Sequence, residues 1–531
     1  MGLDRDRNEA PVADIVLINP RFEVSFWGLE YALPFFGKRA NLPVAALPLL
    51  AALTPSEHRV TIIDENIEPI DYARCAAADI VALTGMVVQR QRMRDILAEL
   101  KRRGVFTVVG GPWVTVSEGY FGDLADVVFV GEAEETWPQF LEEWQSGRCA
   151  KRYEQAEKTD MARVPAPRLD LLKMRHYAFG SVQFTRGCPF QCEFCDIIVV
   201  FGRRPRIKTP AQIITELEGL RAHGVRIAFI VDDNLIGNKK AIKEVLRELI
   251  AWQRANGFPL TFMTEASMDL ADDDELMQLM VEARIVIVFV GIESPNEESL
   301  RETKKLQNVR RGGTMIEKVH RIQAAGMEIW GGMIVGFDHD DESVFEAQQR
   351  FLREARISTA MVGMLSAIPK TPLYERLAAA GRLDTADQPE GGTNVLPLGM
   401  SRATLSQGYI RLMNELYAPE PYFERLDGLY LTADHQPDRA WEAYAARHRW
   451  RRWRHNAQLL LEAVGLSLRL LLRVPERGLR RFYGTRLLRL LRLRPDPAVL
   501  RIYAVKCAMH YHVYRLSQRL ATPGASFINT Y

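Results

Sequence analysis

The sequence predicts an α/β protein with two consecutive parallel-sheet domains, followed by a mostly α-helical C-terminal region. Three observations support this fold class. Five short apolar runs alternate with helical patterns before residue 150, six further runs follow between residues 181 and 368, and arginine and leucine dominate a late stretch. Runs that are apolar throughout are typical of strands buried on both faces of a parallel sheet. The length of 531 residues, with 47% hydrophobic and 26% charged residues, fits a multidomain globular protein.

The first domain is expected over residues 12–150 as a doubly wound, flavodoxin-like sheet of five strands. Its apolar runs cover residues 14–20, 59–64, 79–85, 105–112 and 126–132. In such sheets a ligand binds beyond the carboxyl ends of the strands. The candidate binding residues at these ends are Asn19, Thr84, Gly85, Met86, Gly110, Gly111, Pro112, Gly131 and Glu132. A single glycine there can simply end a strand, whereas four such ends on one rim indicate a binding crevice.

A second series of β-α units follows a linker. Residues 151–175 lose the alternating pattern and contain Pro165 and Pro167, which predicts the linker. The second domain is expected over residues 176–385. Its strands are expected at 181–186, 226–233, 260–267, 285–294, 328–337 and 359–368. Six consecutive β-α units predict a parallel sheet that curves into a partial (β/α)6 barrel, with the functional face at the carboxyl ends of its strands.

Three of the six cysteines, Cys188, Cys192 and Cys195, lie in RGCPFQCEFCDI, directly after the first of these strands. The spacing C-x3-C-x2-C lets one loop supply three thiolates to an iron-sulfur cluster, and the missing fourth thiolate leaves one iron open. A three-cysteine zinc site completed by a distant histidine, or buried cysteines clustered by chance, are the alternatives. The absence of a second Cys or Cys-His half-site downstream in the barrel favours the cluster.

This loop, with Phe194 before its last cysteine, resembles that of the radical S-adenosylmethionine (SAM) enzymes. The resemblance implies an enzyme with a [4Fe-4S] cluster whose open iron binds SAM, and cleavage of SAM to a 5'-deoxyadenosyl radical. It also implies SAM contacts at the loop and the other strand ends: Phe194, Asp232, Asp233, Asn234, Glu265, Ser267, Glu293, Ser294, Gly332 and Val335. The family's usual Gly-Gly-Glu is replaced by VDDN at 231–234. Each polar residue of this set, taken alone, is equally well explained as a solvated strand end.

A doubly wound domain directly before such a barrel resembles the cobalamin (B12)-binding branch of the superfamily, over residues 12–380. GGPWVT (110–115) and GEAEETWP (131–138) are similar to N-terminal signatures of that branch. The resemblance implies cobalamin at the rim of the first domain. The D-x-H-x-x-G motif is absent, and His58 is the only histidine before residue 150, so cobalt is expected to lack a protein histidine ligand. A degenerate sheet that binds no corrinoid is the alternative.

Methyl transfer is the commonest chemistry of that branch. The resemblance therefore implies a cobalamin-dependent C-methyltransferase that acts on an unactivated carbon of a lipid or other natural product. The layout, including PKTPLYERLAAAGRL (369–383), is similar to the cobalamin-dependent radical SAM enzymes that methylate hopanoids. An external electron donor of the flavodoxin or ferredoxin type is implied as well. The alternatives are a ring-forming or oxidative radical enzyme, and an iron-sulfur binding or sensing protein without radical chemistry.

The C-terminal region, residues 395–531, concentrates positive charge although the formal net charge of the chain is +2. From Arg447 to Arg494 there are 14 arginines and two acids, Glu462 and Glu476. The apolar stretches are too short and too interrupted for a membrane span. A basic amphipathic helix on an anionic membrane surface and a helical cap on the barrel are both consistent with this pattern. No recognised nucleic-acid-binding fold accompanies the arginines, so no nucleic acid partner is expected.

The cellular location follows from the N-terminus and the cysteines. Residues 1–14 are polar and mixed in charge, without the apolar segment of an export signal. Six cysteines, three of them in one loop, are too few and too clustered for a disulfide framework. A cytoplasmic protein is expected, with peripheral contact at the inner membrane face if the arginine-rich helices bind lipid.

Overall fold

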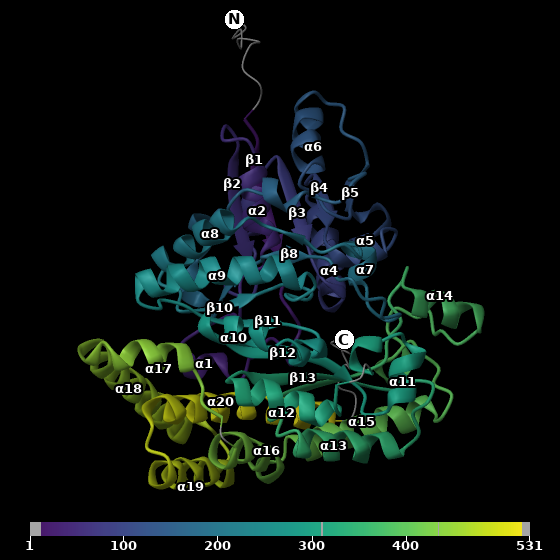
Figure 1. The fold of residues 1–531 in the computed structure, drawn as a ribbon. Helices are drawn as coiled ribbons and strands as arrows, with labels where there is room; N and C mark the ends of the chain where they lie inside the picture. Colours follow the sequence, from purple (N-terminus) through teal and green to yellow (C-terminus); the bar gives the residue numbers. More distant parts are fainter. Residues whose placement is uncertain (1–11, 310–311, 434, 523–531) are drawn as a thin grey trace, which may run out of the picture. The chain divides into compact units, whose positions relative to one another are not determined.

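The computed structural model describes residues 12–309, 312–433 and 435–522, and these form two compact units (Figure 1). The first unit comprises the described residues up to Glu23, residues 44–173 and residues 199–202. The second comprises residues 24–43, 174–198 and the described residues from Arg203 onward. Each unit contains a six-stranded parallel sheet, and helices make up most of the C-terminal region, so the predicted fold class is confirmed.

The sheet of the first unit has the strand order β2-β1-β3-β4-β5-β6 with all neighbours parallel. Its strands are β1 (Asp14–Asn19), β2 (Arg59–Asp64), β3 (Ile80–Thr84), β4 (Thr107–Gly110), β5 (Val127–Val130) and β6 (Arg152–Glu154). Its helices are α2 (Ala46–Leu53), α3 (Tyr72–Ala76), α4 (Arg90–Arg102), α5 (Pro112–Val116) and α6 (Thr136–Gln145). The chain order reverses at β1, which creates a topological switch point between β1 and β3.

The sixth strand departs from the predicted sheet of five, because β6 lies in the predicted linker. It pairs with β5, and Phe129 stands opposite Tyr153. The two rings stack with their centroids 5.1 Å apart, and the Tyr153 hydroxyl donates a hydrogen bond to Glu143 of α6. One buried aromatic side chain thus fixes a strand of three residues, which is too short to show a periodic pattern.

The second unit contains the predicted partial barrel. Its sheet has the order β14-β13-β12-β11-β10-β7, with all neighbours parallel. The strands are β7 (Gly180–Val182), β10 (Ile227–Ile230), β11 (Thr261–Glu265), β12 (Ile285–Glu293), β13 (Glu328–Val335) and β14 (Ala360–Met364). The predicted first strand is split, since β8 (Thr185–Arg186) leaves the sheet and pairs antiparallel with β9 (Arg206–Ile207).

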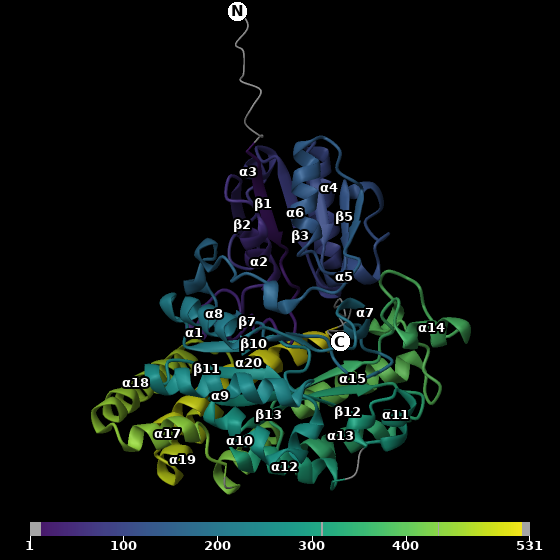
Figure 2. The same cartoon turned by 45° about the horizontal axis from the view of Figure 1, so that its top comes forward.

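Helices connect these strands and cover the sheet. They are α8 (Pro210–Ala222), α9 (Lys239–Asn256), α10 (Asp274–Glu282), α11 (Glu297–Glu302), α12 (Met315–Ala325), α13 (Ser343–Glu354) and α14 (Pro372–Ala379), with the short α7 (Ile197–Val200) after the cysteines. Figure 2 shows α9, α10, α12 and α13 along the strands β10 to β13. The Thr209 hydroxyl caps α8, and Gly257 ends α9 with φ 71°, a conformation that glycine adopts without strain.

From Arg402 onward, the described residues form six α-helices and one π-helical turn. They are α15 (Arg402–Leu416), α16 (Pro419–Asp427), the turn Gly428–Thr432, α17 (Arg439–Ala446), α18 (Arg449–Arg473), α19 (Arg477–Leu493) and α20 (Pro497–Leu520). Most of the side chains of α20 are buried, and α18 packs along it. Within the described chain, none of these helices has the length and apolar character that crossing a bilayer requires.

A buried ion pair joins α20 to the start of β13. Lys506 donates to Glu328, and both side chains are almost completely buried. Trp330 Nε1 also donates to Glu328 at 3.1 Å, and the Tyr430 hydroxyl donates to its other oxygen at 2.7 Å. A buried carboxylate needs such partners, and breaking a buried pair from one side typically costs about 3–5 kcal/mol. The last helix, α20, therefore contributes to the stability of the barrel.

Residues 24–43, with the short helix α1 (Leu33–Phe36), belong to the second unit, whereas the sequence placed them within a continuous domain over 12–150. The Trp27 ring lies 5.1 Å from Phe289 of β12 and 6.3 Å from Trp330 of β13, measured between centroids. His512 of α20 holds the same segment. Its Nε2 donates to the Ser25 carbonyl at 2.9 Å, and its Nδ1 accepts from the Tyr31 amide at 3.2 Å.

We expect the second unit to lose stability in mild acid because of His512. Burial lowers the pKa of His512 from its ordinary 6.5 to about 4, so between these values the unfolded chain binds more protons than the folded one. From about pH 7 to about pH 5 this difference destabilises the fold by about 2 kcal/mol.

Denaturant midpoints measured across this pH range provide the test, with His512→Gln as the control. Glutamine keeps an N–H donor for the Ser25 carbonyl and does not titrate, so its stability should depend less on pH. Identical pH profiles for the two proteins would contradict the assignment.

Candidate functional site

The three cysteines of the C-x3-C-x2-C motif lie in the loop that follows β8. All three are free thiols; Cys192 is buried, and Cys188 and Cys195 are partly exposed. The Cys195 amide donates to the Cys192 carbonyl at 3.2 Å, and this tight turn places the last two cysteines close together. The three cysteines thus share a single short loop at the carboxyl side of the strands, which is the placement that their spacing predicts.

The surroundings of the sulfur atoms fit an iron-sulfur cluster. Asn234 Nδ2 lies 3.8 Å from Cys188 Sγ, and Gln307 Nε2 lies 3.4 Å from Cys192 Sγ. Amide donors to sulfur stabilise thiolates and tune cluster potentials. Within the described part of the chain, no three His, Cys, Asp or Glu side chains converge as ligands of a single metal ion. A cubane does not require this, because each thiolate binds a different iron.

Two adjacent acids at the end of β10 hold the start of the cysteine loop. Asp232 Oδ1 accepts from the Phe184 amide at 2.7 Å, and Oδ2 accepts from the amide and the hydroxyl of Thr185, both at 2.9 Å. Asp233 accepts from the Gly187 amide at 2.8 Å. Burial raises the pKa of Asp232 to about 7 and that of Asp233 to about 6. These carboxylates position the loop, and their predicted contact with SAM stays a prediction.

The middle of the loop is held at Glu193. Its amide donates to the Thr303 carbonyl at 2.9 Å, and its carbonyl accepts from the Leu373 amide at 3.0 Å. Its carboxylate pairs with Lys304 at 2.8 Å and with Arg376 at 3.1 Å. Bonds on both the main chain and the side chain therefore fix the segment between Cys192 and Cys195.

Glu265, at the end of β11, is a partly exposed carboxylate without a protein donor. Burial, together with the nearby Asp233 and Asp232, raises the pKa of Glu265 to about 8. The described residues offer its side chain no hydrogen bond, so its oxygens remain available to a ligand. A strongly perturbed acid at a strand end is typical of a ligand site. Its chemistry suits the ribose hydroxyls or the ammonium group of SAM.

Glu293, at the end of β12, has a strained backbone and a charged partner. Its φ is 65°, a left-handed conformation that costs a non-glycine residue about 1–3 kcal/mol. Lys305 Nζ lies 2.7 Å from its carboxylate; the Glu293 side chain is buried and that of Lys305 is 12% exposed. Burial disfavours the charge of Lys305, but Glu293, Cys192 and Cys195 together outweigh burial and raise the pKa of Lys305. The same ammonium lies 5.9 Å from the centre of the Phe194 ring.

The other predicted SAM contacts lie around this centre. Asn234 Nδ2 donates to Ser267 Oγ at 3.1 Å and links the ends of β10 and β11. Ser294 is buried, and its hydroxyl accepts from the Asn296 amide at 3.1 Å. Gly332 and Val335 lie within β13, opposite Gly291 of β12 and Met364 of β14. The Phe194 ring lies 6.3 Å from Phe337, which follows β13. Contact of these residues with SAM stays a prediction.

Sequence reasoning missed the loop after α11, which contributes Lys305, Gln307 and Asn308. Asn308 Nδ2 donates to the carbonyls of Gly291 and Ile292, at 2.9 and 3.0 Å, and so supports the end of β12. The sequence feature that could have identified this loop is the segment KKLQN (304–308), which brings cations and amides to the acid-rich carboxyl face of the barrel. Attention to strand ends alone does not detect it.

The first unit presents its candidate residues at the carboxyl ends of its strands. Asn19 ends β1 and accepts from Gln89 Nε2 at 3.0 Å, while Thr84 ends β3, so both flank the switch point. Met86 follows β3 and is 51% exposed, which is unusual for a large apolar residue. The rim therefore offers an apolar contact where ligands bind in this fold.

Glycines shape the rest of this rim. Gly111 has φ 102°, and a Cβ atom there would lie 2.4 Å from Thr84 Oγ1, so only glycine lets the two loops approach. Gly110 ends β4 and Pro112 begins α5 beside it. Gly131 has φ 76° and borders open space, whereas Glu132 is buried and accepts from the Thr159 amide at 3.1 Å. These features fit a large flat cofactor at the rim, as the resemblance to cobalamin-binding domains implies.

His58 lies at the other end of the first sheet. Its Nδ1 accepts from the Ala13 amide at 3.0 Å, and its own amide precedes β2. Ala13 directly precedes β1, so the ring belongs to the amino ends of the strands. The first unit thus brings no histidine to its carboxyl rim, where a cobalt ligand would be needed.

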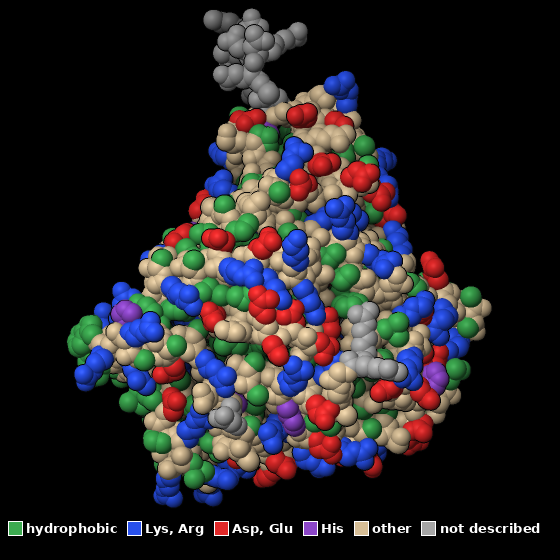
Figure 3. Space-filling model, viewed as in Figure 1, with side chains coloured by type: hydrophobic (Ala, Val, Ile, Leu, Met, Phe, Trp, Pro, Cys, Tyr) green, Lys and Arg blue, Asp and Glu red, His purple; other side chains and the backbone are tan. Residues whose placement is uncertain are grey.

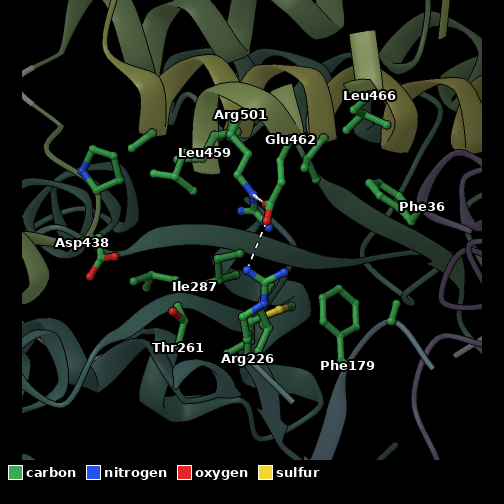
Figure 4. Close-up of a pocket in the computed structure, with 18 of the residues that line it drawn as sticks. Phe36, Phe179, Arg226, Thr261, Ile287, Asp438, Leu459, Glu462, Leu466 and Arg501 are labelled. Atoms are coloured by element: carbon green, nitrogen blue, oxygen red, sulfur yellow. Dashed lines mark hydrogen bonds and ion pairs between the residues drawn. The ribbon is translucent and has the colours of Figure 1, made fainter. Parts of the chain in front are cut away.

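A cavity of about 950 Å³ lies within the second unit, away from the cysteine loop. The amino ends of the strands line one side, including Arg226, Thr261 and Ile287, and helices α18 and α20 line the other (Figure 4). Glu462 spans it with ion pairs to Arg226 at 3.1 Å and to Arg501 at 2.7 Å. Roughly 13 Å of strand separates Thr261 from Glu265 at the carboxyl end, so this cavity is not the reaction site.

Comparisons with family models match three parts of the chain. Residues 182–350 match the radical SAM superfamily, and residues 41–141 match the B12 binding domain. Residues 371–523 match a domain of unknown function, DUF4070.

Relatives with known names cover most of the chain. An uncharacterised methyltransferase of Synechocystis sp. is 41% identical over 417 residues, 77% of each chain. The hopanoid C-2 methylase of Rhodopseudomonas palustris is 34% identical over 419 residues, 78% of each chain.

Two solved structures share the fold. The cobalamin-dependent SAM radical enzyme OxsB, with aqua-cobalamin bound, aligns with a TM-score of 0.60 at 14% identity, over 96% of this chain and 81% of that one. The radical SAM methyltransferase TsrM of Kitasatospora setae, with cobalamin and a [4Fe-4S] cluster, aligns with a TM-score of 0.56 at 18% identity, over 75% and 82%.

Replacing any one of Cys188, Cys192 and Cys195 by alanine should abolish the visible absorption of the cluster after anaerobic reconstitution with iron and sulfide. Each thiolate is one of only three local ligands, so the cluster cannot be held by the remaining two. Cys507→Ala, at a cysteine buried in α20, is the control and should keep the absorption. Full absorption in any loop variant, or a colourless protein that holds zinc, would contradict the ligand assignment.

Asp232→Asn should weaken both the fold and the cluster site. The amide has one acceptor oxygen for three donors, and leaving a buried donor unpaired costs about 1–3 kcal/mol. We expect a lower denaturant midpoint together with reduced cluster content per chain.

Asp340→Asn is the matched control for this variant. Asp340 is also buried and accepts from two amides, of Gly336 and Phe337, and from the Ser299 hydroxyl. It should lose comparable stability yet keep its cluster. Equal cluster loss in the two variants would show that Asp232 acts only through general stability.

Proposed function

Because the chain belongs to the cobalamin-binding branch of the radical SAM superfamily, we propose that it methylates an unactivated carbon of a hopanoid-like lipid. The protein is an enzyme, and its cofactors are SAM, a [4Fe-4S] cluster and cobalamin. The relatives at 41% and 34% identity are named as a methyltransferase and as a hopanoid methylase, which supports methyl transfer and a lipid substrate.

One observation carries the proposal: a rigidly held loop of three cysteines and, at the same carboxyl face of the barrel, a partly exposed carboxylate without a partner. Asp232, Asp233 and Glu193 fix the loop by hydrogen bonds at both its start and its middle. Glu265 has no protein donor and a raised pKa. A site that holds three soft ligands rigid and leaves an acid unpaired is suited to a cluster with one open iron and a cationic cosubstrate.

The chain's own residues would act mainly by binding and orientation. Cys188, Cys192 and Cys195 would hold the cluster, which together with SAM supplies a radical able to abstract hydrogen from an unreactive carbon. Glu265 would bind polar groups of SAM. Lys305 holds the Glu293 carboxylate in place. The rings of Phe194 and Phe337 would exclude water from the reacting centre, which limits quenching of the radical.

The proposal includes an external electron donor of the flavodoxin or ferredoxin type and a cytoplasmic location. Each reductive cleavage of SAM consumes one electron, so a small electron carrier must dock within reach of the cluster. Ring formation or oxidation on another natural product uses the same cofactors, and a sensing protein would hold the cluster without radical chemistry. No contact in the described residues favours either alternative, so product analysis must separate them.

The test uses the reconstituted holoenzyme with SAM, a reductant, methylcobalamin and a hopanoid extract under anaerobic conditions. We expect 5'-deoxyadenosine and S-adenosylhomocysteine to form together, and a lipid product heavier by one methylene unit. Cys192→Ala is the control and should form none of these. Formation of 5'-deoxyadenosine alone would indicate different radical chemistry, and the absence of 5'-deoxyadenosine would overturn the enzymatic proposal.

A further inference from the structure

Large apolar side chains in contact with solvent gather on two helices. Among the described residues 14 large hydrophobic side chains are exposed, and ten of these belong to α18 and α19. They are Trp450, Trp453, Leu460, Leu461, Val464, Leu468 and Leu472 of α18, and Leu488, Leu491 and Leu493 of α19. We call this set the α18–α19 face. Scattered exposed leucines need no explanation, but a contiguous set of this kind marks an interaction site.

Helix α18 carries apolar rows on two opposite sides. Ala463, Leu466 and Leu470 form the inner row, which is buried where α18 packs along α20. Leu461, Val464, Leu468 and Leu472 recur at spacings of three and four residues and form an outer row. Leu461 is 74% exposed and Leu472 is 77% exposed. Packing explains the inner row and leaves the outer row without a partner in the described structure.

The α18–α19 face is also strongly basic. The only acids between Arg447 and Arg494 are Glu462 and Glu476. Both are already engaged, Glu462 with Arg226 and Arg501, and Glu476 with Arg515. Five exposed arginines of α18 and α19 have no side-chain hydrogen bond or ion pair among the described residues: Arg449, Arg454, Arg477, Arg481 and Arg492. Figure 3 shows basic and apolar side chains next to one another at the lower left, where Figure 1 places α18 and α19.

The combination of exposed apolar side chains and unpaired arginines indicates which kind of partner fits the α18–α19 face. A second copy of the chain, joined by a two-fold axis, would bring the same arginines against each other. A nucleic acid would satisfy the arginines and leave the leucine row in water. An anionic bilayer satisfies both, because apolar side chains enter the interface while arginines reach the lipid phosphates. No described helix can span a bilayer, so the contact would be peripheral.

We propose that the α18–α19 face binds the surface of an anionic lipid bilayer. The outer row of α18 lies in the interfacial region, with Trp450 and Trp453 at headgroup level, and the unpaired arginines hold lipid phosphates. This inference goes beyond methylation, since it requires neither SAM nor radical chemistry. It adds a means by which an enzyme without a membrane span reaches a lipid.

The test is flotation of the full chain with vesicles of phosphatidylcholine, with or without phosphatidylglycerol. We expect at least about tenfold stronger binding to the anionic vesicles, weakened by salt. Leu468→Ser combined with Leu472→Ser should reduce this binding about tenfold, because both side chains leave the interface. Leu398→Ser removes a leucine that is 65% exposed outside the face and should bind as the wild type does. All these side chains are exposed, so circular dichroism should remain unchanged.

Three results would overturn the proposal. They are equal binding to neutral and anionic vesicles, unchanged binding by the Leu468→Ser and Leu472→Ser variant, and a dimer in ultracentrifugation that this variant abolishes while vesicles go unbound. The last result would assign the face to a second copy of the chain. Binding is measured without SAM or reductant, so its failure is distinct from a failure of the methylation assay.

Discussion

Two neighbouring carboxylates at the end of one strand hold the loop on which the chemistry of this protein depends. Asp232 and Asp233 accept four hydrogen bonds from residues 184–187, the segment that leads into Cys188. A loop of eight residues cannot fix three sulfur atoms by its own stiffness. The loop is therefore held in place by the neighbouring strand β10. The order of the β-α units determines the position of the cysteines, because it places the end of β10 beside the start of their loop.

This arrangement crowds negative charge at the carboxyl face of the barrel. Asp232, Asp233, Glu265 and Glu293 all lie at strand ends, and Lys305 is the cation that reaches Glu293. Burial, together with the like charges of Asp233 and Asp232, raises the pKa of Glu265. A cationic cosubstrate would reduce this repulsion. The acidic side chains that destabilise the site without a ligand therefore favour binding of a sulfonium and an ammonium group.

The sequence predicted those features that depend on neighbouring residues. Apolar runs located five strands of the first sheet and the six units of the second, and the cysteine spacing located the cluster loop. β6 was not predicted because a strand of three residues is too short to show a periodic pattern. Residues 24–43 were misplaced because Trp27 packs against β12 and β13, which are far away in the chain. The resemblance predicts a SAM contact for Asp232, and the structure adds bonds to main-chain amides that the sequence did not predict. Lys305 and Gln307 were missed because only folding brings their loop to the cysteines.

The buried pair of Lys506 and Glu328 joins residues that are 178 positions apart in the chain. Its consequence concerns how such enzymes can diversify. A C-terminal region exchanged between relatives would have to bring a cation to the position facing Glu328, or arrive together with a change in β13. Recombination at the end of the barrel is therefore constrained by the need to preserve this ion pair, even though the helical region is a separate segment of the sequence. On this barrel, a new C-terminal region therefore needs a matching change at the base of the barrel.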